Sequence, residues 1–169
     1  TLKGNAFNSI LKEDAFILLG ADISGIQDFV FDLTAKGAAK GLKGRSYYIS
    51  ALCETIARYI LIQEKLSPAN LLFSGGGHFY LLLPVTARDR IVIYRNYINR
   101  VLFSAHRGKL SIVLAGVPLS FNSFSADNFG GKWLEVTDLL QRSKKRKFLE
   151  LIKEQPLEIL GPYWEGDTV

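Results

Sequence analysis

The hydrophobic positions of this chain form short runs and one-sided stripes that predict alternating strands and helices. An almost unbroken apolar run over 15–22 is typical of a strand that is covered on both faces, so we expect it to be central. Apolar runs at 70–73 and 79–83 flank a glycine-rich segment and predict a β-hairpin. Apolar and smaller or polar residues alternate over 109–117, which predicts a fourth strand.

Between these strands, apolar residues recur at the three-and-four spacing of helices with one buried face. A short helix is predicted over 26–33. The helix before the hairpin is predicted to begin at Ser46, as its cap, and to end before Pro68. The helix after the hairpin is predicted over 87–106 and ends at Gly108. The expected buried stripes are Ile49, Leu52, Cys53, Ile56, Ala57, Ile60 and Leu61 in the first long helix, and Ile91, Tyr94, Ile98, Val101, Leu102 and Ala105 in the second.

The order strand, helix, strand, strand, helix, strand predicts an α+β domain with the ferredoxin-like split β-α-β topology. Its antiparallel four-stranded sheet carries both helices on one face. We expect an N-terminal lead-in over 1–14, the split β-α-β domain over 15–119, and a C-terminal helical appendage over 120–169 with a helix near 133–140. Because the chain starts at Thr1 and contains no Met, we interpret it as a piece of a longer protein, with further modules beyond the appendage.

Composition limits the function only loosely. The chain has 169 residues, of which 48% are hydrophobic, which is enough for one domain with a substantial core. The longest apolar runs are strand-sized and no signal peptide is visible, so we expect no membrane anchor and a cytoplasmic location. The single cysteine, Cys53, excludes an internal disulfide and is most simply a core residue. A net charge of +5 favours nucleotides, RNA or an acidic partner.

Chemically versatile residues lie at the end of the first strand and in the glycine hairpin. In the split β-α-β topology these two segments are neighbours in the sheet, so we expect their residues to lie together. Asp22 at the strand end suits magnesium, and a turn or capping Asp is the alternative. The helix that follows presents free amide groups, which suit a phosphate. The predicted nucleotide-binding cluster consists of Asp22, Ser24, Gly25, Gln27, Ser74, Gly75, Gly76 and His78.

Cations gather in a predicted glycine-rich loop over 35–45. They would contact phosphate or a nucleic-acid backbone, and a solvated loop is the alternative. The run from Lys144 to Lys147 is interpreted as a solvated helix face, with nucleic-acid contact as the other interpretation. His78 has no carboxylate beside it in the sequence, which favours a structural or base-contacting role. The cations of the loop are Lys36, Lys40, Lys43 and Arg45.

Three ordered motifs resemble the first palm domain of the large subunit of type III-A CRISPR effector (Csm) complexes. They are G-A-D-I-S-G-I-Q-D-F at 20–29, K-G-R-S-Y-Y at 43–48 and S-G-G-G-H-F-Y-L-L-L-P at 74–84. The resemblance covers 15–117, most of the chain. It implies a cyclic oligoadenylate synthetase, in which two palms hold two ATP molecules between them and target RNA activates their coupling.

The resemblance also implies a difference in chemistry. The catalytic palm of such proteins carries G-G-D-D, whose two carboxylates hold Mg or Mn, whereas this chain has Gly75-Gly76-Gly77-His78. We therefore expect a non-catalytic palm that lines one ATP pocket, with Asp22 as a candidate metal ligand and most of the metal held by the second palm of the same polypeptide. The full-length protein is further expected to cut single-stranded DNA through an HD domain, and to bind CRISPR RNA, target RNA and other effector subunits in antiviral defence.

Two other functions fit the same pattern. The split β-α-β topology also serves RNA-recognition modules, and Phe73, Phe79 and Tyr80 lie on strands where such modules stack bases. The R-G-F-G-F-V-type signature of those modules is absent. A purely structural palm that binds no small molecule is the third interpretation. Titrations with ATP and with single-stranded RNA distinguish the three.

Overall fold

Four strands form one antiparallel sheet in the computed structural model, which describes residues 11–31 and 38–144. The strand order is β2-β3-β1-β4, so the first strand is central. The strands are β1 (Asp14–Ser24), β2 (Leu71–Gly75), β3 (His78–Pro84) and β4 (Ser111–Ser120). The predicted α+β fold with ferredoxin-like topology is therefore confirmed.

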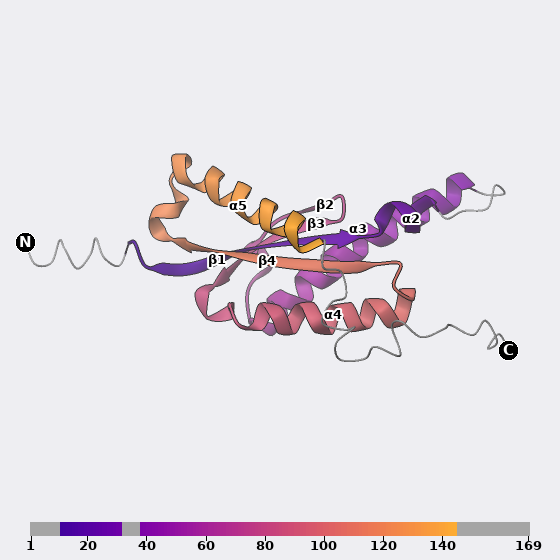
Figure 1. Ribbon diagram of the computed structural model, residues 1–169, viewed down its shortest axis with the longest axis horizontal. Helices are drawn as coiled ribbons and strands as arrows, with labels where there is room; N and C mark the ends of the chain where they lie inside the picture. Colours follow the sequence, from indigo (N-terminus) through magenta and orange to yellow (C-terminus); the bar gives the residue numbers. More distant parts are fainter. Residues whose placement is uncertain (1–10, 32–37, 145–169) are drawn as a thin grey trace, which may run out of the picture.

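Helices lie on both faces of this sheet (Figure 1). The two long helices α3 and α4 pack on one face, as predicted, and α5 packs on the other. The helices are α2 (Ile26–Phe31), α3 (Ala38–Gln63), α4 (Arg90–His106) and α5 (Ala126–Lys144), with 3₁₀ turns η1 (Pro68–Asn70), η2 (Val85–Ala87) and η3 (Phe121–Phe124). No helix within the described residues is long and apolar enough to cross a bilayer.

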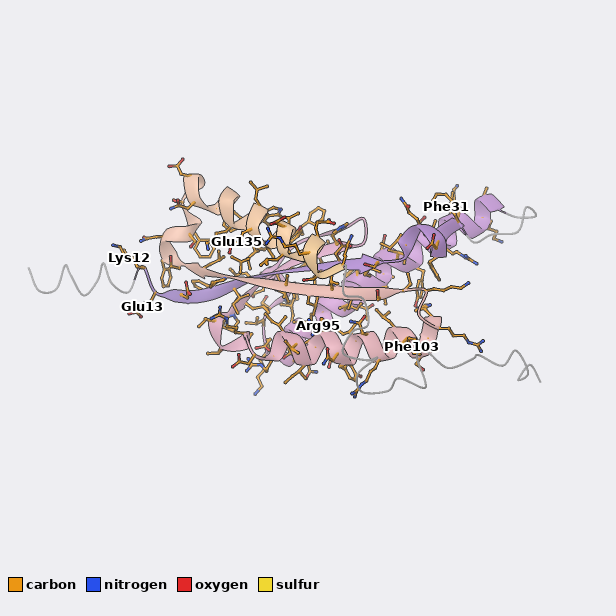
Figure 2. All side chains as sticks on the ribbon, in the orientation of Figure 1. Lys12, Glu13, Phe31, Arg95, Phe103 and Glu135 are labelled. Carbon is orange, nitrogen blue, oxygen red and sulfur yellow. The ribbon has the colours of Figure 1, made fainter. Side chains whose placement is uncertain are left out.

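The long strands β1 and β4 run along the long axis of the molecule (Figure 1). Lys12 and Glu13 lie at one end, just before β1, and Phe31 lies towards the other, at the end of α2 (Figure 2). Asp22 is near the end of β1 and therefore belongs to the end of the sheet from which α2 continues.

Successive side chains of β1 point to opposite faces of the sheet and contribute to two hydrophobic cores. Leu19 and Ala21 face α3 and α4, whereas Leu18 faces α5. Gly20 also lies under α5, where an added Cβ would lie 2.9 Å from Cδ1 of Leu140. The missing side chain lets α5 approach the sheet closely, which turns the expected C-terminal helix into a second covering layer.

The helix before the hairpin begins earlier than the sequence predicts. α3 starts at Ala38, so Ser46 lies inside the helix and the described part of the predicted loop is helical. Leu42 packs against the core beneath α3 and α4, and Nη1 of Arg45 donates a hydrogen bond to the Phe29 carbonyl at 2.5 Å. These tertiary contacts outweigh the helix-breaking tendency of glycine, about 1 kcal/mol per residue.

The buried face of α4 also differs from the predicted stripe. Val101 is 50% exposed and Ala105 is exposed, whereas Asn99 is buried. The Asn99 amide donates a hydrogen bond to the Ile112 carbonyl at 2.9 Å and accepts one from the Ile112 amide at 2.8 Å. A polar side chain thus fixes α4 to the edge strand β4, a contact that apolar periodicity cannot reveal.

A buried carboxylate connects the region after α3 to the start of α4. The Glu64 side chain is 2% exposed and accepts hydrogen bonds from Nε of Arg90 at 2.7 Å and from the Tyr94 hydroxyl at 2.5 Å. The Arg90 hydrogen bond, more than the opposing effect of burial, holds the pKa of Glu64 below its usual 4.5, and Tyr94 adds to it. Because the folded pKa is the lower one, Glu64 stabilises the fold above its unfolded pKa and this contribution is lost as the pH falls through the folded value.

We expect Glu64→Gln to lower the free energy of unfolding at pH 7 by about 1–3 kcal/mol, because a hydrogen bond to a charged group is lost. The variant should also lose less of its remaining stability on acidification. Urea unfolding at neutral and acidic pH measures both effects. Glu54→Gln is the control, since Glu54 is 52% exposed and pairs with Arg58 in solvent. The same acid dependence in Glu64→Gln and in the parent would contradict this role of Glu64.

Candidate functional site

The end of β1 and the glycine hairpin meet at one end of the sheet. Asp22 pairs with His78 across the β1–β3 ladder. The Ile23 amide donates a hydrogen bond to the Gly77 carbonyl at 2.9 Å. The predicted adjacency of Asp22 and the hairpin is therefore confirmed.

The hairpin turns on two glycines with positive φ, 60° at Gly76 and 88° at Gly77. Two successive positive φ values in a two-residue loop are those of a type I′ turn. Gly75 pairs with His78 just before the turn. A Cβ on Gly77 would lie 2.1 Å from Cδ1 of Ile26, whereas one on Gly76 would meet nothing within 4 Å. Gly77 therefore packs against the start of α2, and the backbone at Gly76 is accessible.

Asp22 has a buried carboxylate with two basic neighbours. Its side chain is 2% exposed, and Oδ2 lies 3.0 Å from Nε2 of His78 and also contacts Nζ of Lys144, the last residue of α5. Neither contact has the geometry of a hydrogen bond, so within residues 11–31 and 38–144 neither carboxylate oxygen accepts one. The two contacts are therefore ion-pair approaches. We refer to Asp22, His78 and Lys144 as the Asp22 cluster.

Two observations at this cluster differ from the premises of the sequence interpretation, and the structural or base-contacting role of His78 stays a prediction. His78 does have a carboxylate beside it, because the sheet register places Asp22 opposite. Its Nδ1 lies 3.1 Å from the Gly76 carbonyl, so the ring also contacts the turn. Lys144 is not on a fully solvated face, since its side chain is 32% exposed and paired. Local sequence gave no signal for Lys144, whose position depends on the packing of α5 against β1.

The charge of Asp22 also acts on a residue on the opposite face of the sheet, beneath α3 and α4. Cys53, on α3, is completely buried, which confirms its interpretation as a core residue. Burial raises the pKa of the Cys53 thiol to about 11, and the negative charge of Asp22 contributes in the same direction, while a hydrogen bond with the Gly77 backbone opposes both. The thiol is therefore protonated at neutral pH and is a poor nucleophile.

The remaining residues of the predicted nucleotide cluster do not share one face. Ser24 is half-buried and lies two positions after Asp22, so the pleat of β1 places both on the α5 side. Ser74 pairs with Phe79, whose side chain is in the core beneath α3 and α4, so Ser74 belongs to the opposite side. A separate hollow is lined by Gln27, Asp28, Phe31 and Lys109.

The cations that we predicted to contact phosphate or RNA are on α3. Lys40 and Lys43 are exposed on its first turns. Arg45 instead binds α2, through its hydrogen bond to the Phe29 carbonyl and a guanidinium placed 5.4 Å from the Phe29 ring centroid. Lys36 lies outside the described residues. Arg45 therefore has a structural contact that the sequence did not indicate.

The Asp22 cluster does not fit a divalent metal ion. Mg and Mn prefer several oxygen ligands, and here one carboxylate already contacts an ammonium group. No three His, Cys, Asp or Glu side chains form a metal-binding group in the part of the chain that the structure describes. The donor set thus gives no support to Asp22 as a metal ligand.

The RNA-recognition alternative requires aromatic side chains on an open sheet. Phe79 is completely buried beneath the long helices, and Tyr80 is 7% exposed, with its ring centroid 4.1 Å from that of Trp133 on α5. Phe73 remains 50% exposed. Because α5 covers the sheet face on which bases would stack, this arrangement argues against the RNA-recognition function.

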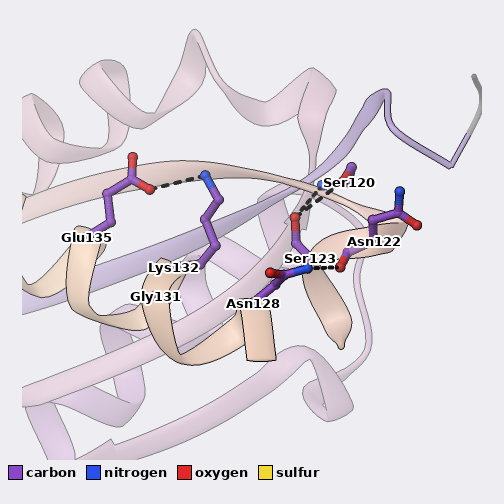
Figure 3. A pocket seen from close by; sticks show the side chains of 7 residues that line it. All are labelled: Ser120, Asn122, Ser123, Asn128, Gly131, Lys132 and Glu135. Atoms are coloured by element: carbon purple, nitrogen blue, oxygen red, sulfur yellow. Dashed lines mark hydrogen bonds and ion pairs between the residues drawn. The ribbon is translucent and has the colours of Figure 1, made fainter. Parts of the chain in front are cut away.

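A polar pocket lies at the other end of β1, between η3 and α5 (Figure 3). Ser120 at this pocket pairs with Asp14 at the start of β1, so the pocket is remote from the Asp22 cluster. Oγ of Ser123 accepts a hydrogen bond from the Ser120 amide at 3.0 Å, and Lys132 contacts Glu135 at 3.1 Å. These side chains bind one another and local backbone, so we assign the pocket no ligand.

Comparison with known proteins identifies relatives of this architecture. Residues 15–160 match the family model for the Csm1 subunit domain B. The curated single-strand-specific deoxyribonuclease Cas10/Csm1 (subtype III-A) of Methanocaldococcus jannaschii is 40% identical over 166 residues, which cover 92% of this chain and 20% of that protein. Its counterpart in Mycobacterium tuberculosis is 41% identical over 156 residues, which cover 83% and 19%. The chain spans about a fifth of the length of these curated relatives.

Solved structures share the fold. A crystal structure of a Csm1–Csm4 cassette in complex with cA3 has a TM-score of 0.77 and 26% identity, and the match covers 92% of this chain and 22% of that one. A cassette in complex with AMPPNP has a TM-score of 0.76 and 26% identity, with 90% and 22% covered. The fold of most of this chain is thus found in these proteins.

Proposed function

The chain belongs to the Csm1 subunit domain B family, and from this premise we propose that it is the nucleotide-binding, non-catalytic first palm of a type III-A CRISPR effector large subunit. On this proposal the full-length protein makes cyclic oligoadenylate from ATP when target RNA is bound, and the second palm of the same polypeptide holds Mg or Mn. Related Csm1–Csm4 cassettes have been crystallised with AMPPNP and with cA3, which supports a nucleotide ligand.

The Asp22 cluster is the observation on which the proposal depends. At the hairpin, where a catalytic palm needs carboxylates, this chain has glycine backbone and His78. The remaining acid, Asp22, is covered by Lys144. Accessible glycine backbone at the hairpin and an ammonium group that contacts Asp22 suit a triphosphate, but nothing in the cluster activates a 3′-hydroxyl through a metal ion.

The partners follow from the same family membership. We propose that the chain contacts the second palm, the Csm4 subunit found with its relatives, CRISPR RNA and target RNA. Cleavage of single-stranded DNA, which the names of the curated relatives state, is assigned to an HD domain of the full-length protein. The site of action is the cytoplasm, where the protein contributes to antiviral defence.

Nucleotide titration of the full-length protein tests the proposal. We expect saturable AMPPNP binding, and we expect Ser24→Ala to weaken it about two- to tenfold, the equivalent of one lost hydrogen bond. Thr86→Ala removes an exposed hydroxyl in η2, after the far end of β3, and serves as the control. Isothermal titration calorimetry gives both affinities. Equal affinity in the Ser24 variant and the parent would favour a purely structural palm.

A further inference from the structure

The packing of α5 aligns Lys144 with Asp22. Leu140 packs over Gly20. Lys144 follows Leu140 by four residues, so both lie on the same face of the helix. Asp22 follows Gly20 by two residues and lies on the same face of β1. The spacing of a helix and that of a strand therefore bring the ammonium and the carboxylate together, and the contact is a consequence of how α5 crosses the sheet.

Lys144 contacts a buried carboxylate but is itself partly accessible to solvent. The Asp22 side chain is 2% exposed, whereas that of Lys144 is 32% exposed. An ammonium group has three donors, and the contact with Oδ2 engages one side of it. The partly exposed Lys144 side chain therefore keeps access to the solvent at the end of the sheet where the glycine hairpin turns. Lysine is a flexible point charge that binds phosphate well in such positions.

From this arrangement we propose that Lys144 is a built-in cation of the nucleotide site, which contacts Asp22 in place of a divalent metal ion and binds the nucleotide phosphates directly. The inference rests on the proposed function and extends it by naming Lys144 as a phosphate-binding residue that acts without a metal ion. Nucleotide binding at this palm does not require a metal ion, unlike binding at a palm whose hairpin holds Mg or Mn through carboxylates.

The experiment is an AMPPNP titration of the full-length protein with Mg and, separately, with EDTA. We expect two bound nucleotides with Mg and one with EDTA, retained at this palm. Asp22→Asn should bind the metal-free nucleotide at least as tightly as the parent, because it removes a negative charge and keeps the ammonium. The double variant Asp22→Asn/Lys144→Met removes both charges, so it leaves no buried unpaired ion, and it should bind about tenfold more weakly than Asp22→Asn.

Lys132→Met is the matched control. Lys132 is on the same helix, is also 32% exposed, and pairs with a carboxylate, but lies near the opposite end of β1. We expect unchanged affinity in this variant, and thermal unfolding confirms that each variant is folded. Equal affinity of Asp22→Asn and the double variant in EDTA would overturn the inference, as would loss of both nucleotides from the parent in EDTA. Absence of saturable binding even with Mg is a different result, which would overturn the proposed function itself.

Discussion

Replacing Gly25 by alanine is expected to destabilise the domain by about 3 kcal/mol or more. Gly25 joins β1 to α2 with a φ of +86°, and a Cβ there would lie 1.9 Å from the carbonyl oxygen of Lys109. A backbone oxygen cannot rotate away as a side chain does. The junction would have to separate from the start of β4, which disrupts the end of the sheet that carries the Asp22 cluster. Urea unfolding of the variant measures the loss.

Two other glycines provide controls for this prediction. Gly76 has a φ of +60° and nothing within 4 Å of its added Cβ, so Gly76→Ala carries the conformational cost alone, about 1–2 kcal/mol. Gly77→Ala should be intermediate, because the atom at 2.1 Å is the tip of the flexible Ile26 side chain. We expect the loss of stability to be smallest for Gly76→Ala, intermediate for Gly77→Ala and largest for Gly25→Ala. Equal effects at Gly25 and Gly76 would contradict the close approach of the two backbones.

The sequence predicts the fold well because the fold depends on local patterns. Apolar runs and one-sided stripes identify every strand of the sheet and both helices beneath it, and their order specifies the strand neighbours. The adjacency of Asp22 and His78 follows from that order, without knowledge of any side-chain contact. The type I′ turn likewise follows from glycines between two apolar runs.

Features that depend on distant contacts are the ones that the sequence does not reveal. The start of α3 is decided by packing against α2, which stabilises a segment whose glycines and lysines suggest a loop. The sequence predicts Lys144 to be part of a solvated run, because its partner, Asp22, lies on another element that is distant in the sequence. Its role becomes visible only when Gly20 is recognised as the point where α5 crosses β1.

Lys144→Met is expected to lower the free energy of unfolding by about 3 kcal/mol, because it removes the ammonium neighbour of the buried Asp22 carboxylate. In this variant Asp22, with its 2% exposed side chain, keeps His78 as its basic neighbour among the described residues. Asp22→Asn should cost less, about 1 kcal/mol, since the Lys144 ammonium that it leaves unpaired is 32% exposed and can be solvated. Urea unfolding of both single variants measures the difference.

The double variant Asp22→Asn/Lys144→Met distinguishes a coupled charge pair from two residues that affect stability independently. If the charges are paired, the double variant is more stable than Lys144→Met alone, with a coupling of about 1–3 kcal/mol. The pair Lys132 and Glu135, with side chains 32% and 50% exposed, is the control and should couple by about 0.5 kcal/mol or less. Additive effects at Asp22 and Lys144 would contradict the pairing. Because this cycle uses no nucleotide, it tests how Lys144 is held independently of what Lys144 binds.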